Sequence, residues 1–137
     1  MKYISEDQEK DTFAFEATKE ELEVCSKVIH LALEWLDEDF NTRHQNTSED
    51  AYRAGLRLNK KLLALLNEHK EDTPVDTIII TIRFLEASII YACFNEVCNG
   101  LSFGFANVPT LKELIGYNKE ELRIFYAHYK KVYMDCI

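Results

Sequence analysis

Along four stretches of the chain, apolar residues recur at steps of three or four positions, with polar residues filling the intervals. Such spacing gathers apolar side chains on one face and predicts amphipathic helices. The expected helices cover residues 18–39, 49–70 and 119–135, with a short one over 110–115. A Thr or Asn followed by Glu three residues later opens three of them, which is the capping-box spacing typical of a helix start.

The longest apolar run, residues 74–99, has apolar side chains on nearly every side of a helical projection. Thr73 and Pro74 at its start and Gly100 at its end are typical helix boundaries. Residues 75–84 also fit a strand, because β-branched residues favour sheets. The boundary residues and the length of the run favour a central helix over residues 74–99 rather than a strand. Because it is apolar on two sides, its own bundle or a second subunit must cover both, which predicts a homodimer.

Few turn residues accompany these helices, since four Gly and two Pro in 137 residues argue against a turn-rich β fold. Residues 12–16 and 102–106 alternate Phe with small or polar residues, and could pair as a minor ribbon or form loops that plug the bundle ends. Residues 1–11 are polar and expected to fray. The predicted fold is a single all-α domain over residues 1–137, an antiparallel bundle of four main helices and one short helix.

Charge is distributed unevenly along the chain. Residues 1–50 hold 14 acidic and 5 basic residues, a net of −9, whereas residues 51–137 hold 10 acidic and 11 basic residues, a net of +1. This acidity disfavours direct nucleic-acid binding, because phosphate contacts need clustered Lys and Arg. An acidic face suits a basic protein partner instead, and solubility is the simpler alternative. The candidate partner-binding carboxylates lie on the first expected helix: Glu20, Glu23, Glu34, Asp37 and Glu38.

The last expected helix carries an aromatic stripe in which Tyr126, Tyr129 and Tyr133 recur at helical spacing. Tyrosine is enriched at interfaces because it buries a large area at small entropic cost and keeps a polar tip. Core packing is the plainer explanation of such a stripe. These three tyrosines are nevertheless further candidates for partner binding.

Local catalytic and metal-binding motifs are missing from the sequence, which contains no GxSxG, P-loop, HExxH or GxGxxG pattern. His30 and Glu34, one helical turn apart, favour a surface pair over a metal site. The four cysteines lack CxxC or zinc-like spacing and fit reduced core residues of a cytoplasmic protein. The N-terminal residues hold no apolar segment of a secretory signal. We therefore expect no metal or cofactor, and an enzyme is the less favoured class.

Arg83 and Glu86 lie near the middle of the longest apolar run and argue against a membrane span. The leading hypothesis is an acidic, non-enzymatic interaction protein, such as an inhibitor or immunity-type protein that blocks a nucleic-acid-binding or other basic partner. The alternative is a small-molecule-binding bundle or enzyme, with a pocket between the central and C-terminal helices near Arg83, Glu86 and Tyr129. An ion pair that fixes helix register explains Arg83 and Glu86 equally well.

Overall fold

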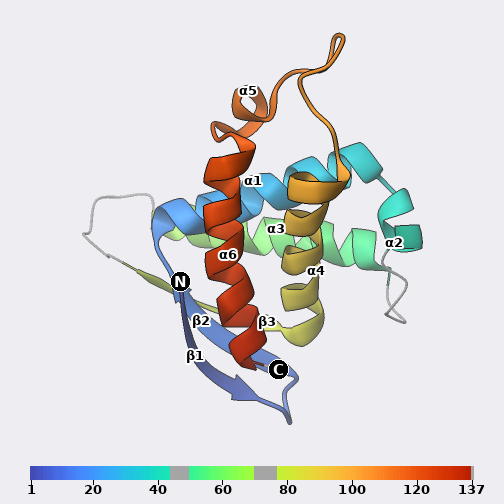
Figure 1. Ribbon diagram of the computed structural model, residues 1–137. Coiled ribbons are helices and arrows are strands. Elements are labelled where there is room, and N and C mark those ends of the chain that lie inside the picture. The colour runs from blue at the N-terminus through green and yellow to red at the C-terminus, as the bar shows by residue number, and fades with distance from the viewer. Residues whose placement is uncertain (44–49, 70–76, 137) are drawn as a thin grey trace.

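A three-stranded antiparallel sheet forms one end of the computed structural model, which describes residues 1–43, 50–69 and 77–136 (Figure 1). The strands are β1 (Lys2–Asp7), β2 (Thr12–Ala17) and β3 (Ile78–Arg83), and β2 is the middle strand. Phe13 pairs with Ile82 and Phe15 with Ile80, although about 65 residues separate the two strands. The sheet thus joins the beginning of the chain to its middle.

One face of the sheet is buried and the other is not. Phe13, Phe15, Ile80 and Ile82 are each at most 1% exposed, whereas Ile79 between them is 61% exposed. Successive side chains of a strand point to opposite faces, so this alternation is typical of a sheet covered on one side. The helices lie on the phenylalanine side, where α6 packs against β1 and α4 against β3.

Six α-helices complete the fold of the described residues. They are α1 (Lys19–Leu36), α2 (Asp39–Arg43), α3 (Ala51–Glu68), α4 (Phe84–Asn95), α5 (Leu111–Ile115) and α6 (Lys119–Cys136). The long helices α1 and α3 pack side by side, and α4 and α6 form a second pair that crosses them (Figure 1). The capping box expected at the first helix is confirmed, because the Glu21 amide donates to Thr18 Oγ1 at 3.1 Å and the Thr18 amide donates to Glu21 Oε1 at 2.8 Å.

The predicted all-α class is wrong, and the central helix over 74–99 accounts for most of the error. The first part of this run is β3, the helix α4 begins only at Phe84, and Glu96–Gly100 form a π-helical turn. Pairing of the β-branched isoleucines with β2 outweighs the helix signals. At the true helix start, the Arg83 amide donates to Glu86 Oε1 at 2.9 Å. The caps expected at Thr73 and Pro74 lie outside the described residues.

The proposed ribbon between residues 12–16 and 102–106 does not form. Residues 12–16 belong to β2, which pairs with β1 and β3. The second segment is irregular, because Gly104 and Ala106 have left-handed φ values of 76° and 48° that break an extended strand. The polar stretch at the start, which we expected to fray, includes β1.

The helix α1 lies at the centre of the core and meets α3 at a glycine. Cys25, Val28, Ile29 and Ala32 of α1 are fully buried. A Cβ atom on Gly55 of α3 would lie 2.8 Å from Leu33 Cδ1 of α1 and 3.5 Å from Ile89 Cγ2 of α4. Gly55 therefore lies where α1, α3 and α4 meet, with no room for a side chain unless Leu33 moves.

We predict that Gly55→Leu lowers the free energy of unfolding by about 1–3 kcal/mol, because a larger side chain overpacks the contact with Leu33 and Ile89. The matched control is Ala64→Leu, an exposed position of the same helix, which should change stability by less than about 0.5 kcal/mol. Urea unfolding of both variants measures the difference. Equal stability of the two variants would show that the contact of Gly55 with Leu33 and Ile89 can accommodate a larger side chain.

Candidate functional site

The candidate carboxylates lie on the solvent side of α1, whose other sides are buried. Glu20, Glu23 and Glu34 are exposed on the helix, and Asp37 and Glu38 are exposed just after it. We call these five residues the acidic ridge. The exposure of Glu20, Glu23 and Glu34 follows from helical spacing, because with Lys27 and His30 they form a series at steps of three and four residues along one side of α1.

Three members of the acidic ridge have partners within the chain. The Tyr117 hydroxyl donates to Glu20 Oε1 at 2.9 Å, and His30 Nε2 lies 3.1 Å from Glu34 Oε2. Burial and the hydrogen bond to Glu20 both raise the pKa of Tyr117. Asp37 accepts a hydrogen bond from Tyr52, which, after burial, is the next cause of a raised Tyr52 pKa. These tyrosines order the ridge while leaving its carboxylates accessible.

Trp35 lies within the acidic ridge, next to Glu34 and two residues before Asp37. Its side chain is 42% exposed, although tryptophan is a large and mostly apolar residue. Its ring packs edge-to-face on Phe103, with ring centroids 5.5 Å apart. Phe105, two residues further along the same loop, is 54% exposed. The carboxyl end of the ridge therefore combines accessible aromatic rings with negative charge.

The three candidate tyrosines of α6 lie at its contact with α4 and not on one exposed face. Tyr129 is fully buried, and its hydroxyl donates to the Ala87 carbonyl at 2.6 Å. Tyr126 stacks on Phe94 at 5.5 Å, and burial and a hydrogen bond with Tyr91 raise its pKa. Tyr133 stacks on Tyr91 at 5.1 Å. Tyr129 is thus a core residue, whereas Tyr126 and Tyr133 are half-buried.

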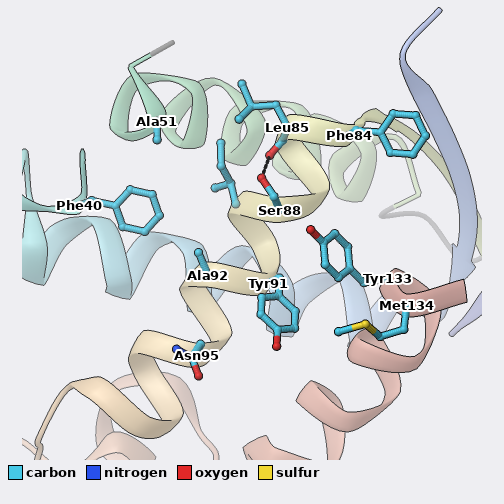
Figure 2. A pocket seen from close by; sticks show the side chains of 11 residues that line it. Phe40, Ala51, Phe84, Leu85, Ser88, Tyr91, Ala92, Asn95, Tyr133 and Met134 are labelled. Carbon is cyan, nitrogen blue, oxygen red and sulfur yellow. Dashed lines mark hydrogen bonds between the residues drawn. The ribbon is translucent and has the colours of Figure 1, made fainter. Parts of the chain in front are cut away.

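A groove with a volume of about 660 Å³ crosses the side of α4 that no other helix fully covers. Figure 2 shows Phe40 of α2 on one side of it, and Tyr133 and Met134 of α6 on the other. Its lining residues are Phe40, Ala51, Phe84, Leu85, Ser88, Ile89, Tyr91, Ala92, Asn95, Tyr133 and Met134. Because α1, α3 and α6 of the same chain pack on α4, a second subunit is not needed to bury its other sides.

Arg83 and Glu86, the pocket residues of the alternative hypothesis, do not line this groove. Arg83 Nε lies 3.7 Å from Glu86 Oε1, and the same carboxylate caps the first turn of α4. Their geometry is that of a helix start. The sequence signal for the groove is instead a row of small, uncharged residues at helical spacing, which includes Ser88, Ala92 and Asn95.

A second ion pair joins α2 to the end of α4. Arg43 Nε lies 2.6 Å from Glu96 Oε2, and Arg43 Nη2 donates to Glu96 Oε1 at 3.2 Å. The Glu96 side chain is 7% exposed and that of Arg43 is 46% exposed. A Cβ atom on Gly100 would lie 3.0 Å from Glu96 Oε1, so a glycine leaves room for the pair. Of these two contacts the one through Nη2 is a hydrogen bond, and among the described residues Glu96 Oε2 has no hydrogen-bond donor.

Comparison with protein-family models, curated proteins and solved structures returned no match for this chain. Within residues 1–43, 50–69 and 77–136, no cluster of three or more His, Cys, Asp and Glu side chains could hold a metal ion. Over the same ranges, no helix combines the length and apolar content needed to cross a membrane. The acidic ridge and the groove are therefore the two surfaces on which a functional argument rests.

Three cysteines are buried with free thiols: Cys25, Cys93 and Cys98. Burial raises the pKa of Cys25 to about 12, with the Glu21 charge adding to it, and raises that of Cys98 to about 11. Burial also raises the pKa of Cys93. A thiol needs its thiolate form to react as a nucleophile, so these residues are inert in the folded protein.

We predict that the three buried thiols resist alkylation at about pH 8, because less than about one in a hundred of them is ionised when the pKa is raised to this extent. The measurement uses a Cys136→Ser variant and counts labelled thiols before and after adding guanidinium. On unfolding, each pKa returns to about 8.5, so all three should label at once. Because the thiols ionise above about pH 8.5 in the unfolded chain but not in the folded one, the free energy of unfolding should fall as the pH rises above about 8.5. Rapid labelling of folded protein would contradict the burial.

Proposed function

We propose that this chain is a non-enzymatic interaction protein whose acidic ridge binds a basic protein surface. The observation that carries the proposal is the exposed Trp35 ring, which packs on Phe103 and is close in sequence to the exposed carboxylates Glu34, Asp37 and Glu38. Interfaces depend on a few aromatic anchors surrounded by polar contacts, and tryptophan is the residue most enriched among such anchors. Carboxylates around the anchor select a partner rich in Lys and Arg.

The charge of the ridge explains both attraction and choice of partner. In the part of the chain that the structure describes, Glu23 and Glu38 have no hydrogen bond or ion pair, so both are available to a basic partner. The carboxylates at the two ends of α1, with Lys27 and His30 exposed between them, present negative charge to a basic surface as phosphates do. We therefore favour a partner whose basic surface otherwise binds nucleic acid, which this chain would block as an inhibitor or immunity-type protein. Three buried, unpaired thiols support a cytoplasmic location as part of the proposal.

The fluorescence of Trp35 reports binding in this test, because Trp35 is the single tryptophan of the chain. An oligoarginine peptide serves as the basic probe, and its binding is followed by the change in tryptophan fluorescence. The triple variant Glu23→Gln, Glu34→Gln, Glu38→Gln should bind roughly tenfold more weakly at about 0.1 M salt, since each exposed pair contributes about 0.2–1 kcal/mol. At about 1 M salt, where charges are screened beyond about 3 Å, the difference should nearly vanish.

The matched control neutralises three carboxylates elsewhere: Glu6→Gln, Glu9→Gln and Asp135→Asn. These exposed residues lie on the β1–β2 hairpin and near the end of α6, and their removal changes the net charge by the same amount. The control should keep most of the affinity. An equal loss in both triple variants would mean that net charge alone attracts the probe and would overturn the ridge as the binding surface.

A further inference from the structure

We propose that the groove across α4 is a binding site for a small, uncharged, largely aromatic molecule that carries a hydrogen-bond acceptor. This site is separate from the acidic ridge and does not depend on the function proposed for it. The groove volume of about 660 Å³ lies within the roughly 300–1,000 Å³ typical of small-molecule pockets. Its walls come from four helices, so the tertiary fold positions them.

The lining of the groove excludes an ionic ligand. None of its eleven residues is Asp, Glu, Lys, Arg or His, although 29% of the whole chain is charged. An ion that entered the groove would lose water without meeting an opposite charge, which costs far more than burial of a neutral group. The ligand is therefore neutral, or enters with a neutral part.

Aromatic rings gather on one side of the groove. Phe84, Tyr91 and Tyr133 line this side (Figure 2). On the opposite side, Phe40 is fully buried behind the surface of the groove. Tyr133 and Tyr91 stack on each other, which holds both rings in place before any ligand arrives. Flat walls of this kind favour a planar ligand, because offset and edge-to-face contacts add to the apolar area that is buried.

Two polar side chains determine where the ligand needs hydrogen-bonding atoms. Asn95 Oδ1 already accepts from Asn99 Nδ2 at 3.0 Å and from the Tyr126 hydroxyl at 3.4 Å. The side-chain Nδ2 of Asn95 has no hydrogen bond within the described ranges. The amide is therefore a donor for a ligand acceptor such as a carbonyl. The Ser88 hydroxyl donates to the Leu85 carbonyl at 2.7 Å, so it offers the ligand only an acceptor.

The size of the groove favours a small molecule over a second copy of the chain. A stable protein interface takes about 20–30 residues on each side, and the groove offers eleven. Its floor of Ser88 and Ala92 lies between side chains of neighbouring helices (Figure 2). This hollow fits a ring better than it fits a flat protein surface.

The test uses the neutral naphthalene dye prodan, which has a carbonyl acceptor and an emission that shifts in apolar surroundings. The anionic dye anilinonaphthalene sulfonate is the charged comparison. We expect prodan to bind at least tenfold more tightly than the sulfonate. Asn95→Leu should weaken prodan binding by roughly twofold to tenfold, because it removes one hydrogen bond of about 0.5–1.5 kcal/mol.

Ala92→Leu fills the floor of the groove and should weaken prodan binding at least tenfold, whereas Ala64→Leu, on the exposed side of α3, should leave it unchanged. Met134→Lys, at a rim position that is 45% exposed, is the variant to use if Ala92→Leu does not fold, and should also weaken binding. The proposal is overturned if prodan binds every variant equally, if the two dyes bind equally, or if prodan does not bind. It also fails if sedimentation shows a dimer that Ala92→Leu dissociates, because the groove is then an interface between copies.

The two proposals fail separately. Neutralising Glu23, Glu34 and Glu38 should leave prodan binding unchanged, and filling the groove at Ala92 should leave the binding of oligoarginine unchanged. If either set of variants lost the binding of both oligoarginine and prodan, the two ligands would share one site, and the ridge and the groove would not be separate.

Discussion

The pairing of β2 with β3 is the constraint on which the rest of the structure depends. Phe13 opposite Ile82 and Phe15 opposite Ile80 place four large side chains on the covered face of the sheet. A slip of one residue in the pairing would turn the buried side chains of one strand toward solvent, so the register is strongly determined. No loop separates β3 from α4, and the Phe84 amide donates to the Asp11 carbonyl at 3.3 Å. The sheet register therefore sets the position at which α4 enters the core, and with it the groove.

Local signals in the sequence predict the helices well and the sheet poorly. The helices α1, α3, α5 and α6 lie close to the expected ranges, because capping boxes and three-four spacing are read within one segment. The isoleucines of β3 fit a strand or a helix equally by local pattern. What decides between them is β2, more than sixty residues upstream, and only the folded chain brings the two together. The edge strand β1 was missed for a different reason: it pairs with β2 across only a short turn, but its polar and mostly exposed residues carry no apolar alternation.

The candidate sites show the same division between local and long-range information. Exposure of the acidic ridge follows from the periodicity of α1 alone, so it was predictable. Whether Trp35 or Tyr129 faces solvent depends on which neighbours cover it, and the result is that Trp35 is 42% exposed and Tyr129 is buried. The position of the groove followed only in part from the sequence: residues of α4 and α6 do line it, but Arg83, Glu86 and Tyr129 do not, and two of its walls come from α2 and α3. Only its floor, a row of small residues on α4, left a trace in the sequence.

The Arg43–Glu96 pair connects the two surfaces physically. It ties α2, which follows directly on the carboxyl end of the acidic ridge, to the π-helical turn at the end of α4. Phe40 lies one turn before Arg43, and Asn95 is adjacent to Glu96, so the pair also sets the distance between one groove wall and its polar end. Glu96 is nearly buried, so its carboxylate cannot separate from Arg43 without a desolvation cost. The pair therefore helps to fix the spacing of α2 and α4 at the end of the groove that Phe40 and Asn95 line.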